Sequence, residues 1–155
     1  GAGRGIGREI ALKLAHAGAD VAVCDLDIAS AEQTAGDIQA LGRQSLAVRT
    51  DVANSGDVTK LFSTFFEKFE KMDILVNNAG ITRDGLLVRM KEPDWDLVLS
   101  INLKSAFLCC KEAARPMMKT RGGKIVNIAS VVGLMGNAGQ ANYARRVIRQ
   151  KIHRH

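Results

Sequence analysis

Cysteine is scarce in this sequence, and its placement argues against a disulfide framework. The three cysteines, Cys24, Cys109 and Cys110, are an odd number, and none belongs to a C-x-x-C pair. Buried, reduced thiols in a cytoplasmic protein explain them best, with metal ligation as the alternative. We therefore expect a cytoplasmic location and no metal site.

Long hydrophobic runs are also missing. No apolar stretch reaches the roughly 18 residues that are needed to cross a bilayer. The chain opens on glycines and a helical pattern, which differs from a signal peptide. We therefore expect no membrane partner.

Acidic residues are absent from the last eleven residues, which hold five lysines and arginines. Without this region, 17 basic residues face 16 acidic ones, so the rest of the chain is nearly neutral. The net charge of +6 therefore indicates no basic face for nucleic acid, and no aromatic or groove-reading motif accompanies the tail. We divide the chain into one domain, residues 1–144, and a basic tail, residues 145–155.

Helical and extended patterns alternate along the domain. Apolar residues at helical spacing predict helices at 5–17, 30–41, 55–71 (capped by Ser55) and 93–121. Short, continuously apolar runs predict buried strands at 21–25, 45–49, 74–76 and 124–129. This alternation favours an α/β fold, a doubly wound parallel sheet of the Rossmann type with helices on both faces.

Glycines crowd the start of the first predicted helix, in the pattern G-x-x-x-G-x-G. Backbone N–H groups exposed at a helix start form a site for a pyrophosphate. The pattern departs from G-x-G-x-x-G because residue 6 is Ile, and glycines also serve tight turns. A loop of this kind normally follows a strand, so we expect a fragment that lacks its first strand.

Two acids stand at the ends of predicted strands. Asp25, about 20 residues after the glycines, is placed to hold a ribose 2′-hydroxyl, or else it caps the next helix. Asp51 is placed where an adenine edge would lie, or else it is a cap or turn residue.

Together with three further motifs, these residues resemble the short-chain dehydrogenase/reductase family. Asp51-Val52 matches the adenine-site pair of that family, and residues 77–80 match its NNAG motif. Asn102, Ser130 and Tyr143 match members of its catalytic tetrad, with Tyr143 lying 13 residues after Ser130. The resemblance implies a nicotinamide-dinucleotide site made of Gly1, Gly3, Arg4, Gly5, Ile6, Gly7, Asp25, Asp51, Val52, Asn78, Ala79, Gly80 and Tyr143.

Within the family, the similarity is greatest to reductases of 3-oxoacyl groups on acyl-carrier protein. It is carried by residues 81–84 (ITRD), 86–87, 89–90 and 136–143 (GNAGQANY). The resemblance covers residues 1–144 and implies an incomplete member, without the first strand, the last strands and the substrate-covering helices. A complete member would be a homotetramer acting on a small-molecule or carrier-bound carbonyl.

The resemblance also implies a role in the reaction for each of these residues. The nicotinamide would supply a hydride, Tyr143 a proton, and Ser130 a hydrogen bond to the carbonyl oxygen, while Asn102 would hold a relay water. In the family a lysine four residues after the tyrosine lowers the pKa of the phenol from its usual ~10. The simpler alternatives are a strand-ending serine, a helix-surface asparagine and an interfacial tyrosine.

The sequence departs from the family at position 147, which is Val instead of that lysine. A shifted reading frame or a mis-spliced end would explain residues 145–155, which we therefore expect to be non-native. Two functions follow, an NAD(P)-dependent oxidoreductase or a catalytically inactive dinucleotide-binding fragment. Asp25 favours NAD because a carboxylate repels a 2′-phosphate, whereas Arg4 leaves NADP as the alternative.

Overall fold

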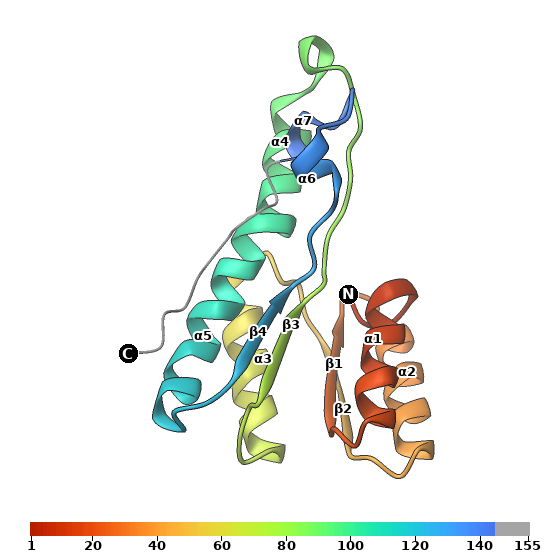
Figure 1. Cartoon of the computed structure of the whole chain (residues 1–155), viewed down its shortest axis with the longest axis vertical. Coiled ribbons are helices and arrows are strands. Elements are labelled where there is room, and N and C mark those ends of the chain that lie inside the picture. The colour runs from red at the N-terminus through yellow and green to blue at the C-terminus, as the bar shows by residue number, and fades with distance from the viewer. Residues whose placement is uncertain (145–155) are drawn as a thin grey trace.

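The computed structural model describes residues 1–144, and the basic tail with position 147 lies outside them. Four strands alternate with helices in this part of the chain (Figure 1). The strands are β1 (Val21–Asp25), β2 (Ser45–Arg49), β3 (Ile74–Asn77) and β4 (Lys124–Asn127). The α-helices are α1 (Gly5–His16), α2 (Ile28–Ala40), α3 (Ser55–Lys68), α4 (Glu92–Leu99), α5 (Ser105–Lys119), α6 (Val132–Met135) and α7 (Ala141–Ala144).

All four strands pair in parallel, which confirms the α/β class. Within residues 1–144 the pairing differs from a single sheet, because β1 pairs only with β2, and β3 only with β4. The two pairs are joined instead through the start of the chain. The backbone nitrogens of Gly1 and Ala2 both donate to the Cys24 carbonyl, at 2.7 and 3.1 Å. The Asn78 side chain donates to the Gly1 carbonyl at 2.6 Å.

Each strand pair has its own hydrophobic core. The first lies between α1, α2 and β1, and contains Ala11, Ala15, Val23, Ala31 and Ile38. The second lies mainly between α3 and α5, next to β3, and contains Val58, Phe62, Met72, Cys109, Ala113 and Met117. In Figure 1, α1 and α2 accompany one pair of strands, and α3 and α5 accompany the other. The carboxyl ends of the two strand pairs therefore belong to two separately packed halves of the domain.

Helix boundaries differ from the predictions where side chains override the local pattern. Asn54, not Ser55, caps α3, because its side chain accepts the Asp57 N–H, and this helix ends at Lys68. Asp27 caps α2, which therefore begins before Ser30.

The predicted long helix at 93–121 is interrupted. Pro93 lies in its first turn as expected. However, residues Ser100–Lys104 form a π-helical turn between α4 and α5. A π turn inside an α-helix frequently marks a functional site.

The strands were expected to be fully buried, and they are only partly so. Val23 in β1 is completely buried, whereas Val126 in β4 is 44% exposed. Val23 belongs to the core between α1, α2 and β1, whereas Val126 belongs to neither core of the described residues. Within residues 1–144, no helix is both long and apolar enough to cross a membrane.

Candidate functional site

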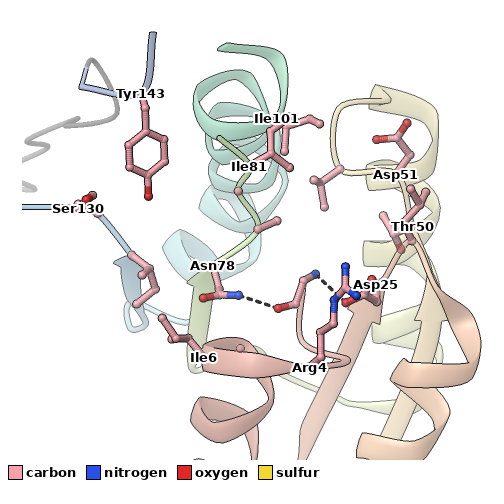
Figure 2. Close-up of a pocket in the computed structure, with 18 residues that line it drawn as sticks. Arg4, Ile6, Asp25, Thr50, Asp51, Asn78, Ile81, Ile101, Ser130 and Tyr143 are labelled. Carbon is pink, nitrogen blue, oxygen red and sulfur yellow. Dashed lines mark hydrogen bonds and ion pairs between the residues drawn. The ribbon is translucent and has the colours of Figure 1, made fainter. Parts of the chain in front are cut away.

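A cavity of about 600 Å³ opens at the carboxyl ends of the four strands. Figure 2 shows its walls coming from both strand pairs. In open α/β sheets this edge is where ligands bind. The cavity is lined by Gly1, Arg4, Ile6, Gly7, Asp25, Leu26, Thr50, Asp51, Val52, Asn78, Ala79, Gly80, Ile81, Ile101, Ile128, Ala129, Ser130 and Tyr143.

Most of the predicted site residues are among these, but Gly3, Gly5 and Asn102 are not. Sequence reasoning missed six lining residues, most of them apolar: Leu26, Thr50, Ile81, Ile101, Ile128 and Ala129. All six directly follow a strand end or flank a predicted site residue. Their position in the chain could therefore have indicated them, although their side-chain chemistry could not.

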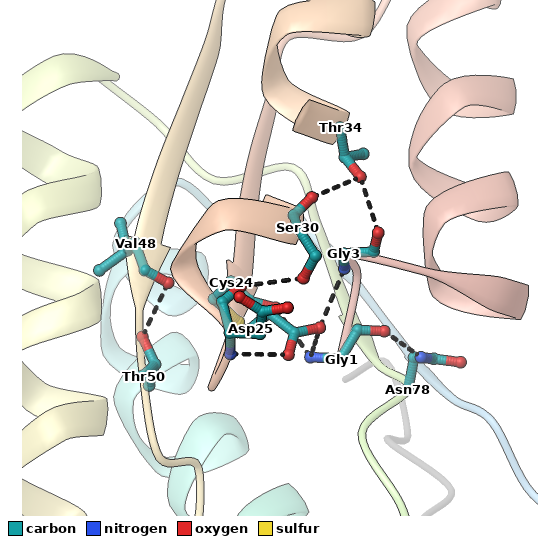
Figure 3. A network of polar contacts seen from close by, with 10 residues as sticks. Gly1, Gly3, Cys24, Asp25, Ser30, Thr34, Val48, Thr50 and Asn78 are labelled. Carbon is teal, nitrogen blue, oxygen red and sulfur yellow. Dashed lines mark hydrogen bonds and ion pairs between the residues drawn. The ribbon is translucent and has the colours of Figure 1, made fainter. Parts of the chain in front are cut away.

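The glycine loop is pressed against its surroundings. A Cβ added at Gly3 would collide with the Ser30 hydroxyl, and one added at Gly7 with the Gly1 carbonyl oxygen. Gly3 thus lies behind the cavity wall, where its carbonyl accepts the Thr34 hydroxyl at 3.3 Å (Figure 3). Only glycine allows so close an approach at these two positions.

Gly5 has a different requirement. Its φ of 55° lies in the left-handed region, and nothing lies within 4 Å of a Cβ added there. The backbone conformation, and not a lack of space, therefore accounts for this glycine.

Asp25 holds the glycine loop in place. One carboxylate oxygen accepts the Gly3 N–H at 3.0 Å, and the other accepts the Asp27 N–H at 3.2 Å. Because Asp27 caps α2, the helix-cap alternative for Asp25 is wrong. Burial by itself raises the pKa of Asp25, but hydrogen bonds from backbone N–H groups, that of Gly3 first, lower it, and the pKa lies below its usual value. The carboxylate is therefore charged at neutral pH and faces the cavity.

Asp51 lies both in the cavity wall and in a turn. It lines the cavity together with Val52. It is also a turn residue, because its carboxylate accepts the Ala53 N–H at 2.9 Å. Its own N–H donates to Asp57 on α3, at 2.9 Å.

The asparagines after β3 tie the strand pairs and the loop together. Asn77 donates to Asn127 across the β3–β4 pair at 2.8 Å, and also contacts the Cys110 sulfur at 3.5 Å. Asn78 donates to the Gly1 carbonyl, as described above, so the glycine loop is fastened to the end of β3. Ala79 and Gly80 continue the same wall of the cavity.

Asn102 is a buried structural clamp. Its side chain accepts the Ile81 N–H and donates to the Ile81 carbonyl, both at 2.8 Å. It is 6% exposed, so the helix-surface alternative is wrong. Asn102 lies in the π-helical turn, and the clamp holds the chain beyond β3 against this turn. The side chains that reach the cavity here are the apolar Ile81 and Ile101.

Ser130 and Tyr143 both line the cavity although they come from different segments. Ser130 follows β4, and its hydroxyl oxygen accepts the Val132 N–H at 3.3 Å. Tyr143 lies on α7, and its N–H donates to the Gln140 carbonyl at 3.1 Å. Figure 2 shows the phenol hydroxyl of Tyr143 pointing into the cavity near Ser130. The cavity thus joins the glycine loop to a pair of hydroxyl groups.

The three thiols are free, and Cys109 is buried. Burial raises the pKa of Cys109 to about 12, and it also raises the pKa of Cys24 and of Cys110. Thiols of this kind are protonated at neutral pH and poorly reactive.

Several known proteins are similar to this chain in sequence or in fold. The model of the short chain dehydrogenase family matches residues 1–145. A 3-oxoacyl-[acyl-carrier-protein] reductase from Synechocystis is 48% identical over 145 residues, which are 93% of this chain and 59% of the relative. One from Staphylococcus aureus is 48% identical over 144 residues, which are 92% of this chain and 58% of the relative.

A solved structure described as a short-chain alcohol dehydrogenase from Sinorhizobium meliloti superimposes with a TM-score of 0.90. It is 36% identical, and the match covers 94% of this chain and 58% of that structure. The chain thus spans somewhat less than two thirds of the length of these proteins. From its fold, its motifs and this match, the chain belongs to the short chain dehydrogenase family.

Proposed function

We propose that this chain carries the cofactor site and part of the catalytic site of an oxidoreductase that reduces a carbonyl with NADH, with a 3-oxoacyl thioester as its substrate class. One observation carries the proposal. Tyr143 and Ser130 line the same cavity as the glycine loop and Asp25. The names of the relatives support the substrate class, because they are reductases of 3-oxoacyl groups on acyl-carrier protein.

The residues of the cavity fit a nicotinamide dinucleotide. The start of α1 offers backbone N–H groups beside glycines, which suits a pyrophosphate. Asp25 is a charged acceptor at the end of β1, which suits the hydroxyls of a ribose. When bound, the nicotinamide supplies the hydride of the reaction.

Two side chains of this chain would then bind and protonate the carbonyl oxygen of the substrate. The Ser130 hydroxyl donates a hydrogen bond to the carbonyl oxygen as negative charge develops there. The Tyr143 hydroxyl gives its proton to the same oxygen, while the carbonyl carbon gains the hydride, so that C=O becomes CH–OH. Asn102 supports this step from a distance, because it fixes Ile81 in the cavity wall.

The choice between the two nicotinamide cofactors rests on Asp25 and Arg4, which both line the cavity. The Asp25 carboxylate would repel a 2′-phosphate, and Arg4 is exposed, where its charge is screened. We therefore infer a preference for NAD(H). Replacing Asp25 with Ala should reduce the preference for NADH over NADPH. An unmodified chain that already prefers NADPH would overturn this inference.

We also infer that the complete protein is a homotetramer assembled through its long helices. Phe107 and Met118 on α5 are 58% and 77% exposed, and such an interface would cover them. Light scattering of a complete version should give four times the subunit mass, and replacing Phe107 with Glu should lower that value.

The central experiment separates binding from turnover. NADH binding is measured by calorimetry, and NADH oxidation is followed spectroscopically with an acetoacetyl thioester as substrate. Tyr143→Phe removes only the hydroxyl, so it should keep NADH binding and lose about 10²–10⁴-fold in turnover. Ser130→Ala should likewise keep NADH binding and lower turnover, and Ser63→Ala, on α3 and outside the cavity lining, is its control. Failure of the unmodified chain to bind NADH would overturn the proposal.

The second candidate is a dinucleotide-binding chain without turnover, and it is favoured by Val147, which stands where the family has a lysine. Binding of NADH without oxidation would identify this case. Val147→Lys should then create turnover if the absent ammonium group is the cause.

A further inference from the structure

Two segments that are distant in the sequence meet beside the cavity. Residues 82–85 follow β3, and residues 136–142 lead into α7 and Tyr143. Figure 1 shows the stretches beyond β3 and β4 running side by side toward one end of the molecule. A backbone hydrogen bond joins them, from the Gly85 N–H to the Gly139 carbonyl, at 2.8 Å.

The side chains of Asp84 and Gln140 make the second connection. The Gln140 amide nitrogen donates to both carboxylate oxygens of Asp84, at 3.1 Å each. The Gln140 side-chain oxygen accepts the Asn137 amide at 3.0 Å, so both ends of the Gln140 amide are engaged. The Gln140 carbonyl in turn accepts the Tyr143 N–H. A short chain of hydrogen bonds therefore runs from Asp84 to the backbone of Tyr143.

Asn142 makes the third connection, and unlike Asp84 it is buried. Its side chain is 1% exposed and donates to the Arg83 carbonyl at 3.0 Å. Its amide oxygen is buried and has no hydrogen-bond partner among residues 1–144. Burial makes Asn142 the anchor of the segment, because breaking its hydrogen bond would leave buried polar groups unpaired. Asp84 is exposed, so removing it should change the free energy of unfolding little.

We propose that Asp84 is a positioning residue that sets the placement of the Tyr143 phenol in the cavity, acting through Gln140. The carboxylate selects one orientation of the Gln140 amide, with its nitrogen toward Asp84, because only that end can donate. This orientation of the Gln140 amide fixes the turn at residues 137–140, and the Gln140 carbonyl of that turn accepts the Tyr143 N–H. The catalytic part of this proposal rests on the proposed function, whereas the placement of the phenol does not.

The experiment uses the fact that Tyr143 is the only tyrosine in the chain. The full chain labelled with 3-fluorotyrosine therefore carries a single fluorine, and its NMR resonance reports on this ring alone. The variants are Asp84→Ala, Asp84→Asn and Gln140→Ala. The control is Asp96→Ala, which removes an exposed carboxylate from the neighbouring α4. Circular dichroism establishes that each variant is folded.

We expect Asp84→Ala and Gln140→Ala to move the resonance toward its position in the urea-unfolded chain, and Asp96→Ala to leave it in place. Asp84→Asn retains one acceptor oxygen, so it should move the resonance less than Asp84→Ala. The double variant Asp84→Ala, Gln140→Ala should move the resonance no further than either single variant, because Asp84 and Gln140 act as one unit. A folded Asp84→Ala variant with the unmodified resonance would overturn the proposal.

Addition of NADH separates this proposal from the proposed function. In one outcome, NADH leaves the resonance of the unmodified chain in place while the Asp84→Ala substitution moves it. That result supports the positioning role and contradicts the proposed function. If NADH moves the resonance of the unmodified chain, and Asp84→Ala changes neither the starting position nor the response to NADH, only the positioning role is contradicted. If the chain turns over substrate, Asp84→Ala should lower kcat about tenfold with little change in KM.

Discussion

Gly7 offers a direct test of how the glycine loop is built. A Cβ at this position would collide with the Gly1 carbonyl oxygen and would approach the Asn78 amide nitrogen to 2.5 Å. These two groups are hydrogen-bonded to each other at 2.6 Å, so neither can move without weakening the link between the loop and β3. Gly7→Ala should therefore be destabilising although alanine is the better helix former.

The magnitude follows from three opposing contributions. Alanine in place of glycine gains about 1 kcal/mol of helix propensity. Overpacking costs about 1–3 kcal/mol, and a weakened hydrogen bond costs about 0.5–1.5 kcal/mol. We expect a net loss of about 1–3 kcal/mol in the free energy of unfolding. We also expect weaker NADH binding, because the displaced residues Gly1 and Asn78 line the cavity.

Gly36 provides the matched control. It lies within α2, is exposed, and has nothing within 4 Å of an added Cβ. Gly36→Ala should therefore stabilise the chain by roughly 0.5–1 kcal/mol. Urea unfolding followed by circular dichroism measures both variants. If Gly7→Ala proved as stable as Gly36→Ala, the close packing of the loop would be refuted.

Three further predictions test other parts of the site. Asn102→Ala should lower the free energy of unfolding by about 2–4 kcal/mol, since it leaves the Ile81 N–H and carbonyl without their partner; an unchanged urea midpoint would contradict the clamp. The folded pKa of Asp25 is lowered, so its contribution to stability is present above its unfolded pKa of about 4 and is lost as pH falls through the folded value. Asp25→Asn should accordingly be less stable than the unmodified chain at pH 7 and approach it in urea titrations in strong acid, and a pH-independent difference would argue against this role. Cys109, with a pKa of about 12, should resist iodoacetamide at pH 8 until the chain is unfolded, as peptide mass spectrometry would reveal; rapid labelling of the folded chain would disprove its burial.

Local sequence patterns determined much of this protein. The four strands and the helices between them were predicted with small errors at their ends, apart from the interruption of the helix at 93–121, because period and capping residues act over a few neighbours. The same patterns placed Asp25 and Asp51 at strand ends. In a parallel sheet the carboxyl ends of the strands share one edge, so residues at those ends line one cavity.

Contacts between distant segments could not be predicted in this way. Asn102 clamps Ile81, 21 residues away, and no periodicity in the sequence indicates that pairing or the π turn around it. The hydrogen bond by which Asp25 holds the glycine loop reaches Gly3, 22 residues earlier, and the capping role of Asp25 was excluded only when the structure placed Asp27 at the cap of α2.

The contacts between residues farthest apart in the sequence hold the segment that carries Tyr143. Gln140 meets Asp84 across 56 residues, and Asn142 meets Arg83 across 59. Sequence motifs indicated that Ser130, Tyr143 and the glycine loop belong to one site. Only the tertiary structure decided what brings them together and holds them, because hydrogen bonds between loops depend on where the strands and helices have placed those loops, and not on the residues next to them in the chain.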